Sequence, residues 1–191
     1  LVNIGGEYLK PYAKQFAVMT YGNHETSCIN HHETDLTARL VDKLNNYGAN
    51  TQRGRYSGFV LLRFWFNENC YITVKYAYHH GPGNGGRVTR GVLDVNHQAV
   101  YLPDAHIVQN GHTHTCYEMC VERDRITNQG RTYQETQLYI RTPGYKQEMA
   151  CGTGWAVEKG HAIRGQGCRE IIFEVSDPSN KTISYGSRRL A

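Results

Sequence analysis

Histidine and asparagine side chains cluster at three places in the chain, each directly after a segment that the sequence predicts to be a β-strand. The clusters are Asn23-His24, His79-His80 and His112-Thr113-His114. In open α/β sheets, ligand sites lie beyond the carboxyl ends of the strands, where the loops converge. Neutral imidazoles and a side-chain amide oxygen are suitable ligands for the divalent ions of Zn, Mn, Fe, Co or Ni. The sequence therefore predicts a metal site to which these clusters contribute.

The segments that must position these clusters show strand-like and helix-like patterns. Runs rich in β-branched and aromatic residues predict strands, and apolar residues at helical spacing predict helices. The predicted strands span residues 16–19, 59–66, 70–78, 106–109, 116–122, 133–141, 169–175 and 182–185. The predicted helices span residues 6–15, 33–47 and 88–99, with a turn over residues 20–25 and hairpins around residues 67–69 and 124–130. An α/β first part followed by an antiparallel tail predicts a mixed α/β (α+β) fold.

Length and composition limit the class of protein. The chain has 191 residues, of which 39% are hydrophobic and 20% charged, so it can bury one core and is not wholly disordered. We therefore expect a single domain over residues 1–191. No apolar run reaches the roughly 18–20 residues of a membrane helix, and no leader is recognisable, so we expect a soluble, cytoplasmic protein without a membrane partner. The net charge of +4 tolerates anionic substrates, and six cysteines without a leader favour free or buried thiols.

Three motifs in a fixed order resemble the calcineurin-like metallophosphoesterases. Gly22-Asn23-His24-Glu25 comes first, His80-Gly81 at a strand end comes second, and Gly111-His112-Thr113-His114 comes third. Each motif is short, but their ordered combination at strand ends is a strong signal. The resemblance covers most of the chain and is strongest over residues 9–114. It implies a two-sheet sandwich flanked by helices. It also implies a hydrolase, a phosphatase or phosphodiesterase, that uses a metal-bound hydroxide at a two-metal site to cleave phosphomonoesters or phosphodiesters.

The resemblance also implies a role for each matching residue. The metal ligands would be Asn23, His80 and His112 for one ion and His114 for the other, with manganese and zinc among the candidate metals. His79 is the second choice for the ligand from its doublet. His24 would be the catalytic residue, stabilising the transferring phosphoryl group and helping to protonate the leaving oxygen.

A glycine-rich segment follows His80 and is expected to be a loop that permits close approach of a substrate. Arg87 and Arg90 lie just beyond it and would bind phosphate oxygens of the phosphate-ester substrate. The string Gly81-x-Gly83-x-x-Gly86 also fits a dinucleotide-binding fingerprint, but it does not follow the first strand and contains Pro82. We therefore favour the substrate loop.

Two motifs of the family are missing from this sequence. The family begins with a strand carrying Asp-x-His, followed by a Gly-Asp motif whose aspartate bridges both metals. Neither precedes residue 22, and Asp104-x-His106 matches only as a string that leads into a later strand. Two divalent ions about 3.5–4 Å apart repel each other strongly unless an anionic ligand bridges them. We therefore expect an N-terminally truncated, incomplete metallophosphoesterase domain that supplies the C-terminal half-site and is weak or inactive alone.

Other interpretations of the same residues stay open. A non-catalytic binding or assembly module would keep the fold with a degenerate metal site. A one-metal or structural-zinc protein would use His112, His114, Cys116 and Cys120. The fourteen tyrosines could stack on single-stranded nucleic acid, although half-buried sheet positions are the commoner use of tyrosine. The native substrate, the metal and the oligomeric state are not determined by the sequence.

Overall fold

The computed structural model describes residues 1–81, 91–145, 152, 155–158, 160, 165–177 and 182–190. The contacts within the chain divide it into two compact units, Leu1–Gly58 and Phe59–Ala191. The single domain expected over residues 1–191 stays a prediction.

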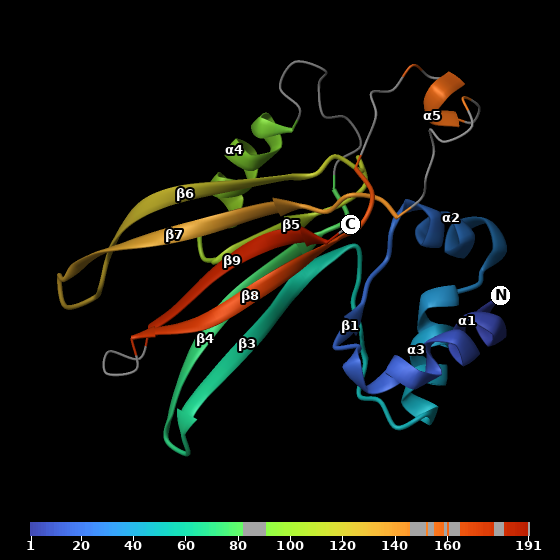
Figure 1. Cartoon of the computed structure of the whole chain (residues 1–191), viewed down its shortest axis with the longest axis horizontal. Coiled ribbons are helices and arrows are strands. Elements are labelled where there is room, and N and C mark those ends of the chain that lie inside the picture. Colours follow the sequence, from blue (N-terminus) through green and yellow to red (C-terminus); the bar gives the residue numbers. More distant parts are fainter. Residues whose placement is uncertain are drawn as a thin grey trace. The chain divides into compact units, whose positions relative to one another are not determined.

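The first unit combines short helices with a two-stranded parallel sheet (Figure 1). Its elements are α1 (Val2–Leu9), the 3₁₀ helix η1 (Lys10–Gln15), β1 (Val18–Met19), α2 (Asn23–His32), α3 (Leu36–Asn46) and β2 (Gln52–Arg53). The predicted helices over residues 6–15 and 33–47 correspond to α1 with η1 and to α3. Helix α3 begins where Asp35 caps it, because the Asp35 carboxylate accepts a 2.8 Å hydrogen bond from the Ala38 amide. Its apolar stripe buries Val41 and Leu44.

The turn predicted over residues 20–25 is wrong in its second half, because helix α2 begins at Asn23. The sequence of α2 is polar, and none of its ten residues, all of which the structure describes, is buried. The apolar spacing that usually indicates a helix is therefore absent. Glu25 caps the N-terminus of this helix, because its carboxylate accepts a 2.8 Å hydrogen bond from the Gly22 amide.

The second unit is built around a five-stranded mixed sheet in the order β3-β4-β5-β7-β6. Its strands are β3 (Ser57–Asn67), β4 (Cys70–His79), β5 (Ile107–Asn110), β6 (Tyr117–Ile126) and β7 (Thr132–Arg141). Strand β5 pairs in parallel with both β4 and β7, and β6 pairs antiparallel with β7. The two predicted hairpins are thus β3–β4 and β6–β7, each longer than the sequence predicts.

Different elements cover the two faces of this sheet (Figure 1). Helix α4 (Val92–Tyr101) packs on one face, where Val95 joins Val108 and Tyr139 in a buried cluster. The antiparallel pair β8 (Cys168–Asp177) and β9 (Thr182–Leu190) covers the other face, and Phe173 and Tyr185 pack there against buried β-branched and leucine side chains. The fold class is therefore mixed α/β, with two sheets packed face to face and a helix outside them, as the sequence predicts.

The described residues also bear on the remaining predictions, which concern one more helix, the cysteines and membrane-spanning segments. The predicted helix over residues 88–99 corresponds to α4, and its first part lies outside the described residues. A short helix, α5 (Trp155–Glu158), was not predicted. Trp65 of β3 packs against Tyr71 of β4, with their ring centroids 4.5 Å apart. The described cysteines, Cys28, Cys70, Cys116, Cys120 and Cys168, are free thiols. In the part of the chain that the structure describes, every helix is too short or too polar to cross a membrane.

Candidate metal centre at the carboxyl edge of the sheet

The carboxyl ends of β4, β5 and β7 meet at one side of the sheet, which is called the carboxyl edge below. In the parallel register, His79 of β4 is opposite Asn110 of β5, and Asn110 is opposite Arg141 of β7. The residues that follow these positions therefore lie next to one another. They include three histidines that the sequence predicts as metal ligands, His80, His112 and His114.

Two of these histidines contact each other. Nε2 of His80 lies 3.0 Å from Nδ1 of His112, and their ring centroids are 4.9 Å apart. Their backbones also approach closely, because the Gly111 amide donates a 3.0 Å hydrogen bond to the His80 carbonyl. Gly81 has a φ of +113°, and a Cβ there would lie 2.9 Å from the Gly111 carbonyl oxygen, so this position requires glycine. His79, the second choice from the doublet, instead accepts a 2.8 Å hydrogen bond at Nδ1 from the Gly81 amide.

The turn over residues 112–114 has an unusual backbone. His112 has a φ of 65° and His114 a φ of 55°, in the left-handed region that residues with a Cβ rarely adopt. Between them, the Thr113 amide donates a 2.8 Å hydrogen bond to the Gly111 carbonyl. The His114 ring lies against Gly144, where an added Cβ would be 3.0 Å from its Cγ. The turn therefore directs His112 toward the end of β4 and His114 toward the segment after β7.

Buried polar side chains adjoin this turn. Gln98 of α4 and Asn110 form a reciprocal amide pair, with hydrogen bonds of 2.7 and 2.8 Å. Arg141 forms a 2.9 Å salt bridge through Nη2 with Asp94 of α4, and its Nη1 donates a 3.0 Å hydrogen bond to the Thr113 hydroxyl. Asp94, Gln98 and Arg141 were not predicted from the sequence. The spacing of four residues between Asp94 and Gln98, on the helix face that also carries the buried Val95, is a signal that could have revealed the first two.

Burial shifts the pKa of two titratable groups at the carboxyl edge in the direction that favours their uncharged forms. It lowers the pKa of the His79 ring and raises the pKa of the Tyr117 hydroxyl. The Tyr117 hydroxyl donates a 3.2 Å hydrogen bond to the Gly91 carbonyl, and its ring centroid lies 5.2 Å from the guanidinium carbon of Arg141. Both groups therefore act through hydrogen bonds and packing rather than as charges.

Asp104 and His106 lie at the opposite end of β5 from the turn. His106 accepts a 2.8 Å hydrogen bond at Nδ1 from the Lys75 amide, and its Nε2 is 2.9 Å from the Glu135 carboxylate. Asp104 is exposed and pairs with Arg125 at 3.3 Å. Because His106 precedes β5 and His112 follows it, the Asp104-x-His106 string is not part of the carboxyl edge.

Asn23 and His24 belong to the first unit. Both lie in the first turn of α2, and both are exposed. Asn23 and His24 belong to one compact unit and the three histidines to the other, and their predicted convergence stays a prediction. Arg87 and Arg90, the predicted substrate-binding residues, lie outside the described residues, as does the glycine-rich segment from residue 82 onward.

The contact between His80 and His112 fits two neighbouring ligands of one divalent ion. With metal–nitrogen bonds of about 2.0–2.1 Å, two ligands lie about 2.9 Å apart at a right angle and about 3.3 Å apart at the tetrahedral angle. The observed distance between Nε2 and Nδ1 is 3.0 Å, and without an ion the same contact is a hydrogen bond whose donor depends on the tautomers.

A complete ligand set is not gathered within the described residues. Among them, no group of three or more His, Cys, Asp and Glu side chains could hold a metal. The structural-zinc alternative of His112, His114, Cys116 and Cys120 is therefore not formed in the described part of the chain. The structure shows a ring-to-ring contact between His80 and His112, which are both predicted ligands.

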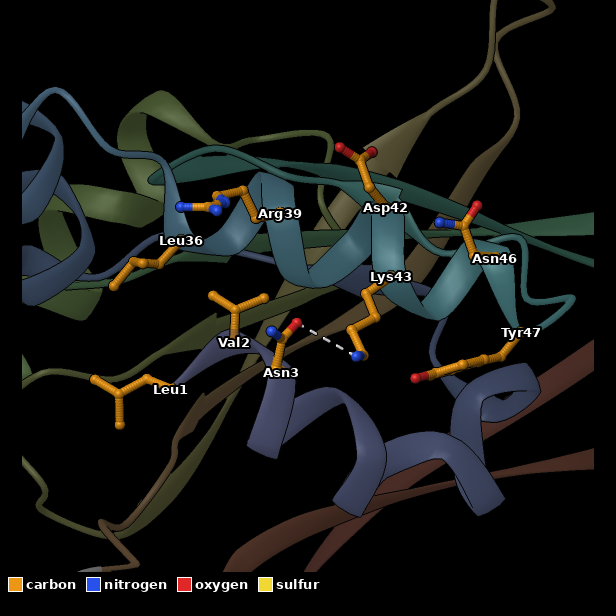
Figure 2. A pocket seen from close by; sticks show the side chains of 9 residues that line it. All are labelled: Leu1, Val2, Asn3, Leu36, Arg39, Asp42, Lys43, Asn46 and Tyr47. Atoms are coloured by element: carbon orange, nitrogen blue, oxygen red, sulfur yellow. Dashed lines mark hydrogen bonds between the residues drawn. The ribbon is translucent and has the colours of Figure 1, made fainter.

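A separate pocket lies between α1 and α3 of the first unit (Figure 2). Its volume is about 770 Å³, and its lining residues are Leu1, Val2, Asn3, Leu36, Arg39, Asp42, Lys43, Asn46 and Tyr47. The Lys43 amino group reaches across it to the Asn3 side chain at 3.4 Å and to the Glu7 carboxylate at 3.2 Å. No described residue that the sequence predicts as a ligand or catalytic group lines this pocket, so it does not belong to the predicted chemistry.

Comparison with known proteins gives a structural similarity without a sequence match. No protein-family model matches the chain, and no curated protein matches it. Among solved structures, the chain is similar to wild-type Vps29 complexed with Zn²⁺ from Entamoeba histolytica. The similarity covers 95% of this chain and 87% of that chain, with 10% sequence identity and a TM-score of 0.36.

Proposed function

We propose that this chain is part of a calcineurin-like metallophosphoesterase, a metal-dependent hydrolase that cleaves phosphomonoesters or phosphodiesters. The observation that carries the proposal is the 3.0 Å contact between Nε2 of His80 and Nδ1 of His112. These histidines come from separate motifs 32 residues apart, and the parallel pairing of β4 and β5 brings them to the spacing of two ligands on one ion.

The proposed ligand set follows the motifs. His80 and His112 hold one ion together with Asn23, and His114 contributes to a second ion. Imidazole nitrogens and an amide oxygen suit Mn, Zn, Fe, Co or Ni. Once bound, the divalent ions supply Lewis acidity to the phosphate ester.

His24 is the proposed catalytic residue. It is exposed in the first turn of α2, where its imidazole can reach a phosphate ester from solvent. From there its imidazole would donate a hydrogen bond to a phosphoryl oxygen and, when protonated, deliver a proton to the leaving oxygen. Arg87 and Arg90 are proposed to bind the other phosphate oxygens.

The proposed ligands of this chain are all neutral, which limits the activity expected of it. Two divalent ions about 3.5–4 Å apart need an anionic bridge, and the 191 residues contain no Gly-Asp motif to supply it. We therefore propose that this chain binds a first ion weakly and turns over slowly unless a bridging carboxylate is provided from outside these residues.

Titration with Co²⁺ tests the metal site, because bound Co²⁺ absorbs visible light. The wild-type chain is expected to bind one ion, and His80→Ala and His112→Ala are each expected to weaken binding by at least about tenfold. His97→Ala removes an exposed histidine of α4 and serves as the matched control. The proposal is refuted if the wild type binds no Co²⁺ or if His80→Ala binds it as tightly as the wild type does.

Hydrolysis of an aryl phosphodiester with Mn²⁺ present tests the catalytic assignment with the same protein. His24→Ala is expected to lower turnover while Co²⁺ binding stays unchanged, because His24 is not a proposed ligand. His31→Ala, an exposed histidine of the same helix, is the control. Lost Co²⁺ binding with preserved turnover in His24→Ala would show that its role is misassigned.

A non-catalytic binding or assembly module is the second candidate function. It is favoured by the neutral side chains of the proposed ligands, because without an anionic bridge they hold a pair of divalent ions poorly. The Co²⁺ titration separates the candidates. No binding by the wild type supports the module, and one bound ion without turnover supports a one-metal binding protein.

A further inference from the structure

We infer that Arg141 is a positioning residue for the turn over residues 112–114. Its buried guanidinium, held by Asp94 of α4, donates to the Thr113 hydroxyl and thereby keeps the residues on both sides of Thr113 in the left-handed conformation. The consequence for metal binding rests on the proposed function, whereas the effect on the backbone does not.

The position of the guanidinium is fixed by several elements at once. Arg141 ends β7 and is completely buried, so its charge needs a close anion and well-placed acceptors. Asp94 of α4 supplies the anion, with Oδ2 2.9 Å from Nη2, and the Tyr117 ring of β6 lies 5.2 Å from the guanidinium carbon. At the start of α4, a Cβ on Gly91 would lie 2.7 Å from Nη1, so the absence of a side chain there makes room for the guanidinium.

The second terminal nitrogen of the guanidinium, Nη1, contacts Thr113 at the centre of the turn. Nη1 donates a 3.0 Å hydrogen bond to Oγ1 of Thr113. The same oxygen lies 3.0 Å from Oγ1 of Thr115, so Thr113 can accept from Arg141 and donate to Thr115. Hydrogen bonds thus fix the Thr113 side chain, and the two residues next to Thr113, His112 and His114, have positive φ. Such backbone conformations persist only where surrounding contacts determine them.

The hydrogen bond from Nη1 is the contact that connects this ion pair to the turn. Asp94 alone compensates the charge through Nη2, and Nε of Arg141 has no hydrogen-bond partner in the described structure. Nη1 thus donates to Thr113 and Nη2 to Asp94, whereas Nε has no acceptor among the described residues. With the turn held in this way, His112 presents Nδ1 to Nε2 of His80, which prepares the pair for one ion before the ion arrives.

Solution NMR of the metal-free chain tests the backbone effect. A strong intraresidue nuclear Overhauser effect (NOE) between the amide and α protons marks a residue with positive φ, because the two protons lie close together there. Strong signals at His112 and His114 are expected in the wild type and in Thr113→Ser, which keeps the hydroxyl. They are expected to weaken in Thr113→Val, which removes it. Thr136→Val is the matched control, since it removes a hydroxyl that contacts the exposed Glu122 far from the turn.

A second variant removes the donor instead of the acceptor. Asp94→Leu combined with Arg141→Met leaves no unpaired buried charge, and it is expected to weaken the same two signals while the protein stays folded. Strong signals in both Thr113→Val and the double variant, or weak signals in the wild type, would overturn the inference.

Co²⁺ binding provides the functional arm of the test. Thr113→Val is expected to weaken Co²⁺ binding by about tenfold and to change the visible spectrum, with Thr113→Ser and Thr136→Val resembling the wild type. Unchanged Co²⁺ affinity and spectrum in Thr113→Val would overturn the consequence for metal binding. If the wild type binds no Co²⁺, the proposed function fails, and the NMR signals still decide whether Arg141 positions the turn.

Discussion

Removal of the Asp94 carboxylate is expected to destabilise the second unit strongly. The Arg141 side chain is 0% exposed and that of Asp94 is 18% exposed, so the charges of this pair are largely shielded from water. Truncating one partner of a buried pair leaves an uncompensated charge and costs about 3–5 kcal/mol. Because Asp94 reaches solvent on one side, water can partly replace its carboxylate. For Asp94→Ala we therefore expect the lower end of this range, a loss of about 3 kcal/mol in the free energy of unfolding.

Urea unfolding followed by tryptophan fluorescence measures this loss in the right part of the chain. Both tryptophans, Trp65 and Trp155, belong to the second unit. With an m-value of about 2 kcal/mol per molar urea, a loss of about 3 kcal/mol lowers the unfolding midpoint by about 1.5 M. Asp104→Ala is the matched control, because it breaks a salt bridge with Arg125 in which the Asp104 side chain is 70% exposed. Its expected cost is less than about 1 kcal/mol.

The double variant Asp94→Leu with Arg141→Met identifies the cause of the loss. Apolar replacement of both partners of a buried ion pair is often neutral or stabilising, so the double variant should regain most of the stability that Asp94→Ala loses. If Asp94→Ala shifts the midpoint no more than Asp104→Ala does, the guanidinium is not desolvated and the reasoning is refuted. If the double variant regains nothing, lost packing rather than an unpaired charge explains the effect.

Two further predictions concern pH and backbone conformation. Burial lowers the pKa of His106 below its ordinary value of 6.5, so the unfolded chain binds more protons than the folded chain as the pH falls through 6.5. The unfolding free energy should therefore fall between about pH 7.5 and pH 5.5, and His106→Asn should reduce this dependence in urea titrations; an unchanged dependence would contradict it. The charged or titratable groups around His106 are Lys75, Arg123, Glu135 and Tyr185. Gly81→Ala should lose at least about 2 kcal/mol in urea unfolding, because it adds a contact of 2.9 Å with the Gly111 carbonyl to the cost of positive φ. Gly130→Ala, with a φ of +80° and open space around it, should lose only about 1 kcal/mol, and equal losses would show that the contact is relieved.

Local patterns in the sequence were sufficient to predict most of the helices and strands. The alternating and aromatic-rich runs that became β3, β4, β6 and β7 have a side-chain period that a strand satisfies. The apolar spacing of α3 and its Asp35 cap lie within a few residues of each other in sequence, so no distant contact is needed to recognise them. Helix α2 lacks such a pattern because its residues are polar and none is buried, although Glu25 closes its N-terminus.

The sequence alone also determined that histidines follow strand ends, since strand ends and histidine positions are both local properties. Which histidines meet was decided by the tertiary structure, because the parallel pairing of β4 with β5 sets His80 against His112. The buried network of Asp94 and Arg141 was likewise beyond the sequence. The two residues are 47 positions apart, and the stabilising contact exists only when α4 packs on the sheet and excludes water from the guanidinium. Burial and long-range proximity are properties of the folded chain, and they give these charged side chains their role.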